Sequence, residues 1–195
     1  DVRRANPSGF TEEGLAVLLL GETRSELDGS AWARIRHGHL GGLPPQVDLS
    51  AEVALGNVIR ALSAADGPDG RPLVRAAHDL SNGGLAQALV DMVLRFGVGG
   101  SFDLTEAQGF NGLSDFEILF SESQARAIIA VPEGALAAVH AAAEAEGVPV
   151  ARLGTTGGDM LAVLGSDLLA DGVGGWIEDV EALRARSEAA LRERF

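Results

Sequence analysis

One stretch of the chain, AHDLSNGGL, concentrates side chains that could bind a ligand. Asp79 supplies a carboxylate and Ser81 a hydroxyl, and Gly83 and Gly84 let the backbone approach a bound group closely. Carboxylate oxygens are preferred ligands of Mg²⁺, and a serine beside backbone N–H groups at the start of a helix can contact a phosphate. The pattern is therefore compatible with a site for a metal ion and a phosphate.

The same stretch has a simpler structural interpretation. Ser81 and Asn82 are residue types that cap helices, and the two glycines that follow suit a tight turn. His78 stands alone beside a strand end, where a hydrogen-bonded structural role is more common than a role as a catalytic base. The residues alone leave both interpretations open.

A second candidate is LFSESQARAII, in which Glu122, Ser123 and Gln124 precede a strand and Arg126 opens it. An arginine on a strand that looks buried needs an anionic partner. In one interpretation Arg126 binds a phosphate or carboxylate of a ligand, with the serines donating hydrogen bonds. In the other, Arg126 pairs with Glu122 at the surface or at a domain edge.

A third candidate, GETRSELDGS, is weaker. We interpret its charged residues Glu22, Arg24 and Glu26 as solvated loop charges, with a functional loop as the alternative. His37 and His39 could ligate a metal together, but neither a cysteine nor a third histidine lies near them in the sequence.

The composition excludes several kinds of chemistry. The chain of 195 residues has no cysteine and no tyrosine, and its 15 basic residues are all arginine. Thiol nucleophiles, cysteine-based zinc sites, lysine Schiff bases and a P-loop lysine are therefore absent. A net charge of −13 argues against a nucleic-acid partner. The longest apolar runs, LAVLLL and AIIAV, fall far short of the roughly 20 residues of a membrane helix, so no membrane partner is expected.

Strands alternate with helices along the chain, which predicts a three-layer α/β domain with one mixed sheet. We expect the strands LAVLLL, LVRAAH and ARAIIAV in this sheet. The further predicted elements are strands at 97–104 and within 148–165, helices at 47–65, 85–96, 132–147 and 177–195, and a short helix beginning near Ser30. We expect a single domain over 1–195 with a connecting segment at 1–14. The absence of an initiator methionine suggests a fragment of a longer chain or a processed product.

Three motifs in order, LLLGETRSELDGS, AHDLSNGGLAQAL and LFSESQARAIIAV, resemble the C-terminal domain of formylglycinamide ribonucleotide amidotransferase. This family is also called phosphoribosylformylglycinamidine synthase subunit II, and the segment GLPPQVDLSAE strengthens the match. The resemblance spans about residues 10 to 165 and implies a fold like the C-terminal domain of aminoimidazole ribonucleotide synthetase. Other superfamily members (aminoimidazole ribonucleotide synthetase, selenophosphate synthetase, thiamine-monophosphate kinase) and a purely scaffolding fragment are the alternatives.

The resemblance implies a cytoplasmic purine-biosynthesis ligase. The full-length enzyme uses ATP and Mg²⁺ to convert formylglycinamide ribonucleotide, a small phosphorylated substrate, to the amidine, with ammonia from glutamine. The implied partners are the N-terminal domains of the same enzyme, a glutaminase subunit and a small bridging subunit. Because the family's catalytic histidine and most nucleotide ligands lie in the N-terminal domains, we expect this chain alone to be inactive and to expose an apolar face where those domains dock.

The resemblance also implies roles for single residues, none of them catalytic. They are metal binding by Asp79, nucleotide binding by Ser81, Gly83 and Gly84, and substrate binding by Glu122, Ser123, Gln124 and Arg126. Asn82 stands where the family usually has aspartate, and we expect little change from it because both residues cap helices equally well.

Overall fold

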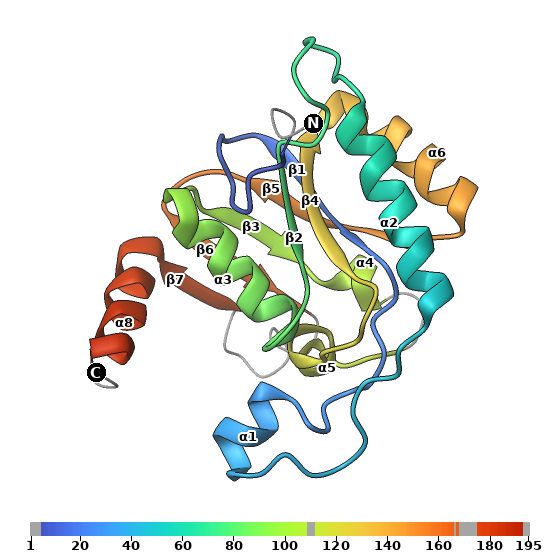
Figure 1. Ribbon diagram of the computed structural model, residues 1–195. Helices are drawn as coiled ribbons and strands as arrows, with labels where there is room; N and C mark the ends of the chain where they lie inside the picture. The colour runs from blue at the N-terminus through green and yellow to red at the C-terminus, as the bar shows by residue number, and fades with distance from the viewer. Residues whose placement is uncertain (1–4, 109–111, 166, 168–174, 193–195) are drawn as a thin grey trace.

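A seven-stranded mixed sheet, in the order β2-β4-β1-β5-β3-β6-β7, forms the centre of the protein (Figure 1). The structure is a computed structural model that describes residues 5–108, 112–165, 167 and 175–192. The strands are β1 (Leu15–Leu20), β2 (Ala76–Asp79), β3 (Gly100–Asp103), β4 (Ala127–Pro132), β5 (Val150–Thr156), β6 (Met160–Leu164) and β7 (Trp176–Asp179). Neighbouring strands run antiparallel except β3 and β6, which run parallel.

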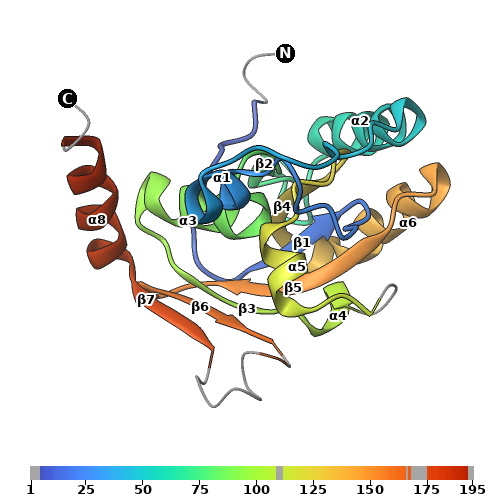
Figure 2. The ribbon, with the colours of Figure 1, turned by 90° about the horizontal axis from the view of Figure 1, so that it is seen from below.

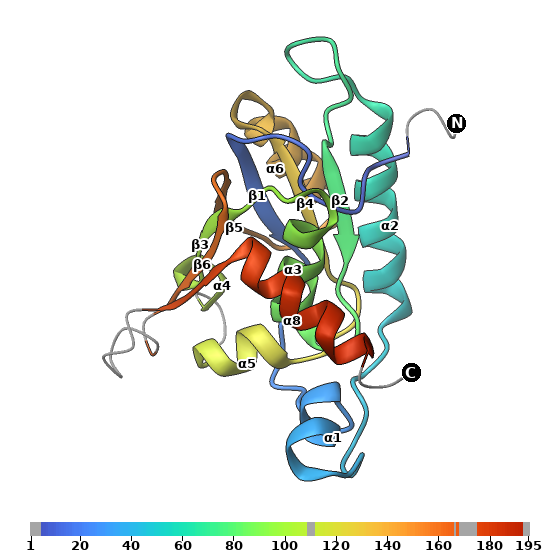
Figure 3. The same ribbon diagram turned by 90° about the vertical axis from the view of Figure 1, so that its left-hand side faces the viewer.

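Helices cover both faces of the sheet. They are α1 (Ala31–His37), α2 (Leu49–Ala64), α3 (Gly84–Phe96), α4 (Thr105–Gln108), α5 (Asp115–Phe120), α6 (Leu136–Glu146) and α8 (Val180–Arg192), with a 3₁₀ turn, η2 (Glu133–Ala135), before α6. Figure 2 shows α2 and α6 grouped on one side of the molecule, with α3 and α8 on the other. Helix α1 projects beyond the lower end of the sheet (Figures 1 and 3).

The sequence of β1 accounts for the arrangement of a sheet between two layers of helices. All six of its residues are buried, and their side chains alternate between the two faces. Leu15, Val17 and Leu19 belong to the apolar cluster beneath α3. The alternate residues Ala16, Leu18 and Leu20 belong to the cluster beneath α2 and α6. A strand that is apolar on both faces is stable only when helices cover both, so LAVLLL specifies a central position in the sheet.

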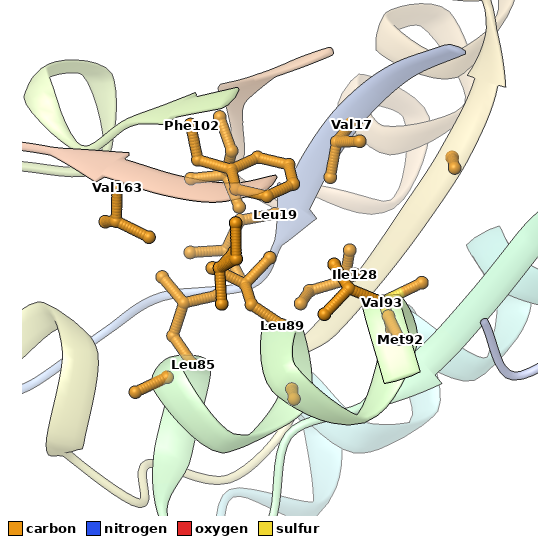
Figure 4. Packing of buried hydrophobic residues seen from close by; sticks show 14 of the residues in the cluster. Val17, Leu19, Leu85, Leu89, Met92, Val93, Phe102, Ile128 and Val163 are labelled. Atoms are coloured by element: carbon orange, nitrogen blue, oxygen red, sulfur yellow. The ribbon is translucent and has the colours of Figure 1, made fainter. Parts of the chain in front are cut away.

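The cluster beneath α3 holds the helix that carries the candidate ligand motif. Leu85, Leu89 and Met92 recur at helical spacing and point toward β1, with Phe102 and Ile128 beside them (Figure 4). Each of these three α3 side chains is 0 % exposed, and burial of one such side chain contributes roughly 1.5–3 kcal/mol. The first turn of α3 is therefore rigidly attached to the sheet.

The predicted fold class is confirmed, and LAVLLL, the AAH part of LVRAAH and AIIAV form the adjacent strands β1, β2 and β4. The prediction of a helix over 177–195 is wrong at its start. Trp176–Asp179 forms β7, paired antiparallel with β6, and α8 begins at Val180. The half-buried Trp176 packs onto the core, while Ile177 on the opposite face is 54 % exposed. This alternation is typical of a strand, but the charged helical sequence that follows made the whole segment look helical.

The strand order and the burial of the N-terminal segment could not be predicted from the sequence patterns. The strands β5 and β6 flank a glycine turn, yet they are not neighbours, because β3 lies between them. The segment expected to be a connection contributes Phe10, which is 0 % exposed, to the core. Among the described residues, no helix combines the length and the apolar character needed to cross a membrane.

Candidate functional site

The end of β2 joins the start of α3 through a turn that only glycine fits. Gly83 and Gly84 have φ values of 82° and 63°, and the Gly84 N–H donates to the Ser81 carbonyl at 3.0 Å. A Cβ on Gly84 would lie 2.5 Å from the Ser121 carbonyl oxygen. The interpretation of Ser81 or Asn82 as the helix cap is wrong, because the N-cap of α3 is Gly83 and no side chain caps it. The tight glycine turn itself is confirmed.

The polar side chains of this turn face solvent. Ser81 and Asn82 are exposed, and the Asp79 side chain is 83 % exposed. His78 Nδ1 lies 2.6 Å from the Asp79 carbonyl oxygen and 3.9 Å from its carboxylate. Asp79 and Ser81 are therefore accessible to a ligand from outside the domain.

Glu122 joins the starts of two helices. Its Oε1 accepts hydrogen bonds from the Gly83 N–H at 2.7 Å and the Ala31 N–H at 2.8 Å, at the beginnings of α3 and α1. The residue is only 8 % exposed. A carboxylate is favourable beside helix N-termini, and a hydrogen bond to a charged group contributes about 1.5–3 kcal/mol. Glu122 therefore holds the glycine turn in place.

The neighbouring serines attach the same loop to the GETRSELDGS segment. Ser123 Oγ accepts from the Arg24 N–H at 3.0 Å and donates to the Arg24 carbonyl at 3.2 Å. Ser121 Oγ accepts from the Glu26 N–H at 3.3 Å, and the Glu26 carbonyl accepts from the Glu122 N–H at 3.1 Å. The three motifs of the sequence thus form one hydrogen-bonded unit.

Glu26 is not a solvated loop charge, so that expectation is wrong for this residue. Its side chain is 14 % exposed, lies 3.3 Å from Arg24 Nε and accepts from the Gln46 N–H at 2.9 Å. Burial raises the pKa of Glu26, but hydrogen bonds from Ser123 and Gln46 and the charge of Arg24 outweigh it and lower the pKa below its usual value. Glu26 is a structural carboxylate that stabilises the loop before α1.

Arg126 is buried and bonded within the chain. It is 2 % exposed, and its guanidinium donates to the Ser123 carbonyl at 2.9 Å, to Thr23 Oγ1 at 3.0 Å and to the Ser121 carbonyl at 2.6 Å. The alternative in which Arg126 pairs with Glu122 at the surface is therefore wrong, because the side chain is buried and donates its hydrogen bonds to loop carbonyls and a hydroxyl. Burial lowers the pKa of Arg126 to about 10, so the side chain is still charged near neutral pH.

A cavity of about 570 Å³ lies between α2, β2 and the loop before β4. Of the predicted site residues, Asp79, Gln124 and Arg126 border it. Gln124 is half-buried, and its Nε2 donates to the Glu122 carbonyl at 3.1 Å. Glu52 of α2 also borders the cavity. It ends the segment GLPPQVDLSAE, but nothing in that segment indicated a role for it, because only the position of α2 over the sheet edge brings it to the cavity.

The other predicted residues lie elsewhere. Gly83 borders a second, more apolar hollow of about 720 Å³, with Trp32 of α1, Phe120 of α5 and Trp176 of β7 among its walls. Ser123 is buried at 0 % exposure inside the loop network. The structure therefore divides the predicted site into an accessible part at Asp79, Ser81 and Gln124 and a buried part around Glu122.

The described residues do not by themselves make a magnesium site. Nowhere in that part of the chain do three or more histidine, aspartate or glutamate side chains cluster as metal ligands. Asp79 offers a single exposed carboxylate, which suits one ligand position. The rings of His37 and His39 lie 6.2 Å apart between centroids, and His39 Nδ1 accepts from the Gly41 N–H.

A family model described as "AIR synthase related protein, C-terminal domain" matches residues 12–165. The chain belongs to this family. Among its relatives, a phosphoribosylformylglycinamidine synthase subunit PurL of a Nocardioides species is 49 % identical over 165 residues, covering 85 % of this chain and 20 % of the relative. PurL of Leifsonia xyli is 43 % identical over 195 residues, covering 100 % and 24 %. The chain thus spans about a fifth to a quarter of the length of these relatives.

Several solved structures share the fold of this chain. PurL of Thermotoga maritima complexed with FGAR matches with a TM-score of 0.76 at 18 % identity, covering 93 % of this chain and 29 % of that one. The same protein complexed with ATP gives a TM-score of 0.69 at 17 % identity, covering 93 % and 27 %. A hydrogenase maturation protein, HypE, in complex with ATP gives 0.59 at 19 % identity, covering 92 % and 54 %. The resemblance drawn from the three motifs is confirmed.

Proposed function

We propose that this chain is the C-terminal domain of an ATP-dependent ligase subunit of purine biosynthesis. The full-length enzyme would convert formylglycinamide ribonucleotide to the amidine, with ammonia released from glutamine by a glutaminase subunit. The observation that carries the proposal is an identity of 43–49 % to PurL proteins over 85–100 % of this chain. The union of the three family motifs in one hydrogen-bonded unit supports it.

In that reaction ATP activates the amide oxygen of the substrate, and ammonia then displaces phosphate. We assign the accessible residues to binding: Asp79 as one ligand of a nucleotide-associated Mg²⁺, Ser81 as a phosphate contact, and Gln124 as a substrate contact. The remaining metal ligands would come from the nucleotide and from other domains, because the described residues lack them.

The buried residues have a different role in this proposal. Glu122, Ser123 and Arg126 would act on ligands indirectly, since their polar groups bind the chain's own backbone and Thr23. Gly83 and Gly84 would let the backbone pass close to the nucleotide. No residue of this chain is assigned to bond making or breaking, so we propose that the isolated domain is inactive.

The surface around α1 suits a domain interface. Ile35, Leu43 and Leu49 are 76 %, 82 % and 73 % exposed, and all lie between α1 and the start of α2. Exposed large apolar side chains that form a patch commonly mark an interaction site, and these three belong to one stretch of the chain. We assign this region to docking of the N-terminal domains of a cytoplasmic enzyme, whose further partners would be the glutaminase and small bridging subunits. A solved structure described as PurLQS of Thermotoga maritima supports such an assembly.

The test compares the full-length protein with this chain. Both are supplied with ATP, Mg²⁺, formylglycinamide ribonucleotide and ammonium, and the amidine is measured by mass spectrometry. We expect product from the full-length protein and none from the 195 residues alone. Product from the isolated chain would contradict the assignment of catalysis to other domains. Absence of product from the full-length protein would contradict the proposed reaction and favour a scaffolding role or another superfamily activity.

A further inference from the structure

Ala125 has an unusual backbone conformation. Its φ is 56°, and among the described residues no other non-glycine residue has a positive φ. The left-handed region is unfavourable for residues with a Cβ, so a conformation of this kind persists only where surrounding contacts impose it. Ala125 lies between Gln124, which borders the 570 Å³ cavity, and the buried Arg126.

Two contacts hold Ala125 in this conformation. On one side, its N–H donates to Glu52 Oε1 of α2 at 2.9 Å. On the other side lies Gly21, which follows β1 and has a φ of 92°. A Cβ on Gly21 would lie 2.1 Å from the Ala125 carbonyl oxygen, so the two backbones are in direct contact. The residue is thus enclosed between α2 and the end of β1.

The conformation of Ala125 decides where Gln124 points. Arg126 is fixed by three hydrogen bonds, so a change at Ala125 would be transmitted to the residues before it. If φ of Ala125 returned to a negative value, Gln124 would rotate relative to the cavity. Glu52 borders the same cavity and is half-buried beside it.

We propose that Glu52 is a positioning residue: by holding Ala125 in the left-handed conformation, it directs the Gln124 carboxamide toward the substrate. The proposal rests on the proposed function for the identity of the substrate. A carboxamide both donates and accepts hydrogen bonds, which suits a ligand that carries an amide group. Glu52 has no part in the three sequence motifs, and its contribution comes entirely from the placement of α2.

A double-mutant cycle on this chain tests the backbone contact. Glycine adopts a positive φ without a steric penalty, and its N–H can still donate to Glu52, so Ala125→Gly removes the strain but keeps the hydrogen bond. Glu52→Ala removes that hydrogen bond in both backgrounds, but with Ala125 present the released loop can return to a negative φ and recover its strain energy. The melting temperature is therefore expected to fall by roughly 5 °C in the Ala125→Gly background and by only about 2 °C with Ala125 present. Glu144→Ala, which removes an exposed carboxylate from α6, is the matched control and should show no such dependence. Equal losses in both backgrounds would overturn the proposal.

Kinetics of the full-length enzyme test the consequence for the substrate. Glu52→Ala is expected to raise the KM for formylglycinamide ribonucleotide about 10-fold with little change in kcat, because one positioned hydrogen bond is at stake. The KM should stay close to that of the unmodified enzyme in Glu52→Gln, because the amide oxygen can still accept from the Ala125 N–H. It should also return most of the way in the double variant Glu52→Ala/Ala125→Gly. A loss confined to kcat, or no rescue, would overturn the proposal. Inactivity of the unmodified enzyme would contradict the proposed function instead, and the melting cycle would still decide the role of Glu52.

Discussion

Two neighbouring parts of the site contain similar polar residues in opposite surroundings. In the loop before β4, Glu122, Ser123 and Arg126 are 8 %, 0 % and 2 % exposed, and all three make hydrogen bonds within the chain. At the end of β2, the Asp79 side chain is 83 % exposed. Residues of the family motifs can therefore differ in role: buried ones fix the backbone, and exposed ones remain available to a ligand.

The comparison has a physical basis in desolvation. A buried carboxylate or guanidinium is tolerated only when hydrogen bonds replace its water, which commits those groups to the fold. An exposed carboxylate keeps its water until a ligand displaces it. Stability and ligand affinity should therefore respond to different substitutions in the two parts, and variants of each can break or sharpen this distinction.

The largest effect on stability is expected from Glu122→Ala. The substitution leaves the Gly83 and Ala31 N–H groups without their carboxylate acceptor, at a cost of about 3 kcal/mol in the free energy of unfolding. Urea unfolding of this chain measures it. Asp79→Ala is the matched carboxylate removal and should change the free energy by less than about 0.5 kcal/mol. Similar losses from both would erase the distinction between the two parts.

A smaller effect is expected from Gly84→Ala. The new Cβ would lie 2.5 Å from the Ser121 carbonyl, at a φ of 63°, so we expect a loss of about 2–3 kcal/mol. Gly97→Ala is the control, because Gly97 has a φ of 78° and nothing within 4 Å of a Cβ. Its loss should stay near 1 kcal/mol, the cost of the left-handed backbone alone. A larger loss of melting temperature in Gly97→Ala than in Gly84→Ala would contradict the close contact between Gly84 and the Ser121 carbonyl.

A pH-dependent effect is expected from Glu117, which accepts hydrogen bonds from Ser25 and Ser114. These bonds hold the pKa of Glu117 below its usual 4.5 in the folded state. The stabilisation is therefore fully present above pH 4.5 and is lost as the pH falls through the lowered pKa. In Glu117→Gln the decline of melting temperature below pH 4.5 should be less steep. An unchanged acid decline would show that Glu117 does not contribute.

The smallest effect on stability is expected from Ser81→Ala. Because Gly83 is the N-cap of α3 and no side chain caps the helix, the melting temperature should change by no more than about 1 °C. A true cap would lose about 1 kcal/mol instead, or several degrees. A loss of that size would restore the capping interpretation of the turn.

The sequence predicted what depends on local pattern. The apolar run of β1 and the glycine turn before α3 are both set by neighbouring residues. The role of Glu122 could not be predicted, since its partners Ala31 and Gly83 lie 91 and 39 residues away. Only the order of strands in the sheet brings these segments together.

Long-range packing also accounts for the strand at Trp176 and for the partners of Arg126, which the sequence did not predict. The strand at Trp176 exists because β6 has a free edge to pair with, which no local pattern shows. Arg126 took backbone carbonyls as partners because the loop folds around its guanidinium. The sequence motifs named the candidate residues, and long-range packing decided which of them are buried within the chain and which are exposed.

A nucleotide titration of the full-length enzyme with Asp79→Asn tests the division of the site most directly. Asparagine keeps the shape of Asp79 but removes the charged oxygen that Mg²⁺ prefers. Calorimetry is expected to show Mg²⁺–nucleotide affinity weakened on the order of 10- to 1,000-fold, with the melting temperature of the ligand-free protein unchanged. Unchanged affinity, or a loss of stability comparable to that of Glu122→Ala, would contradict the assignment of Asp79 to the ligand and of Glu122 to the fold.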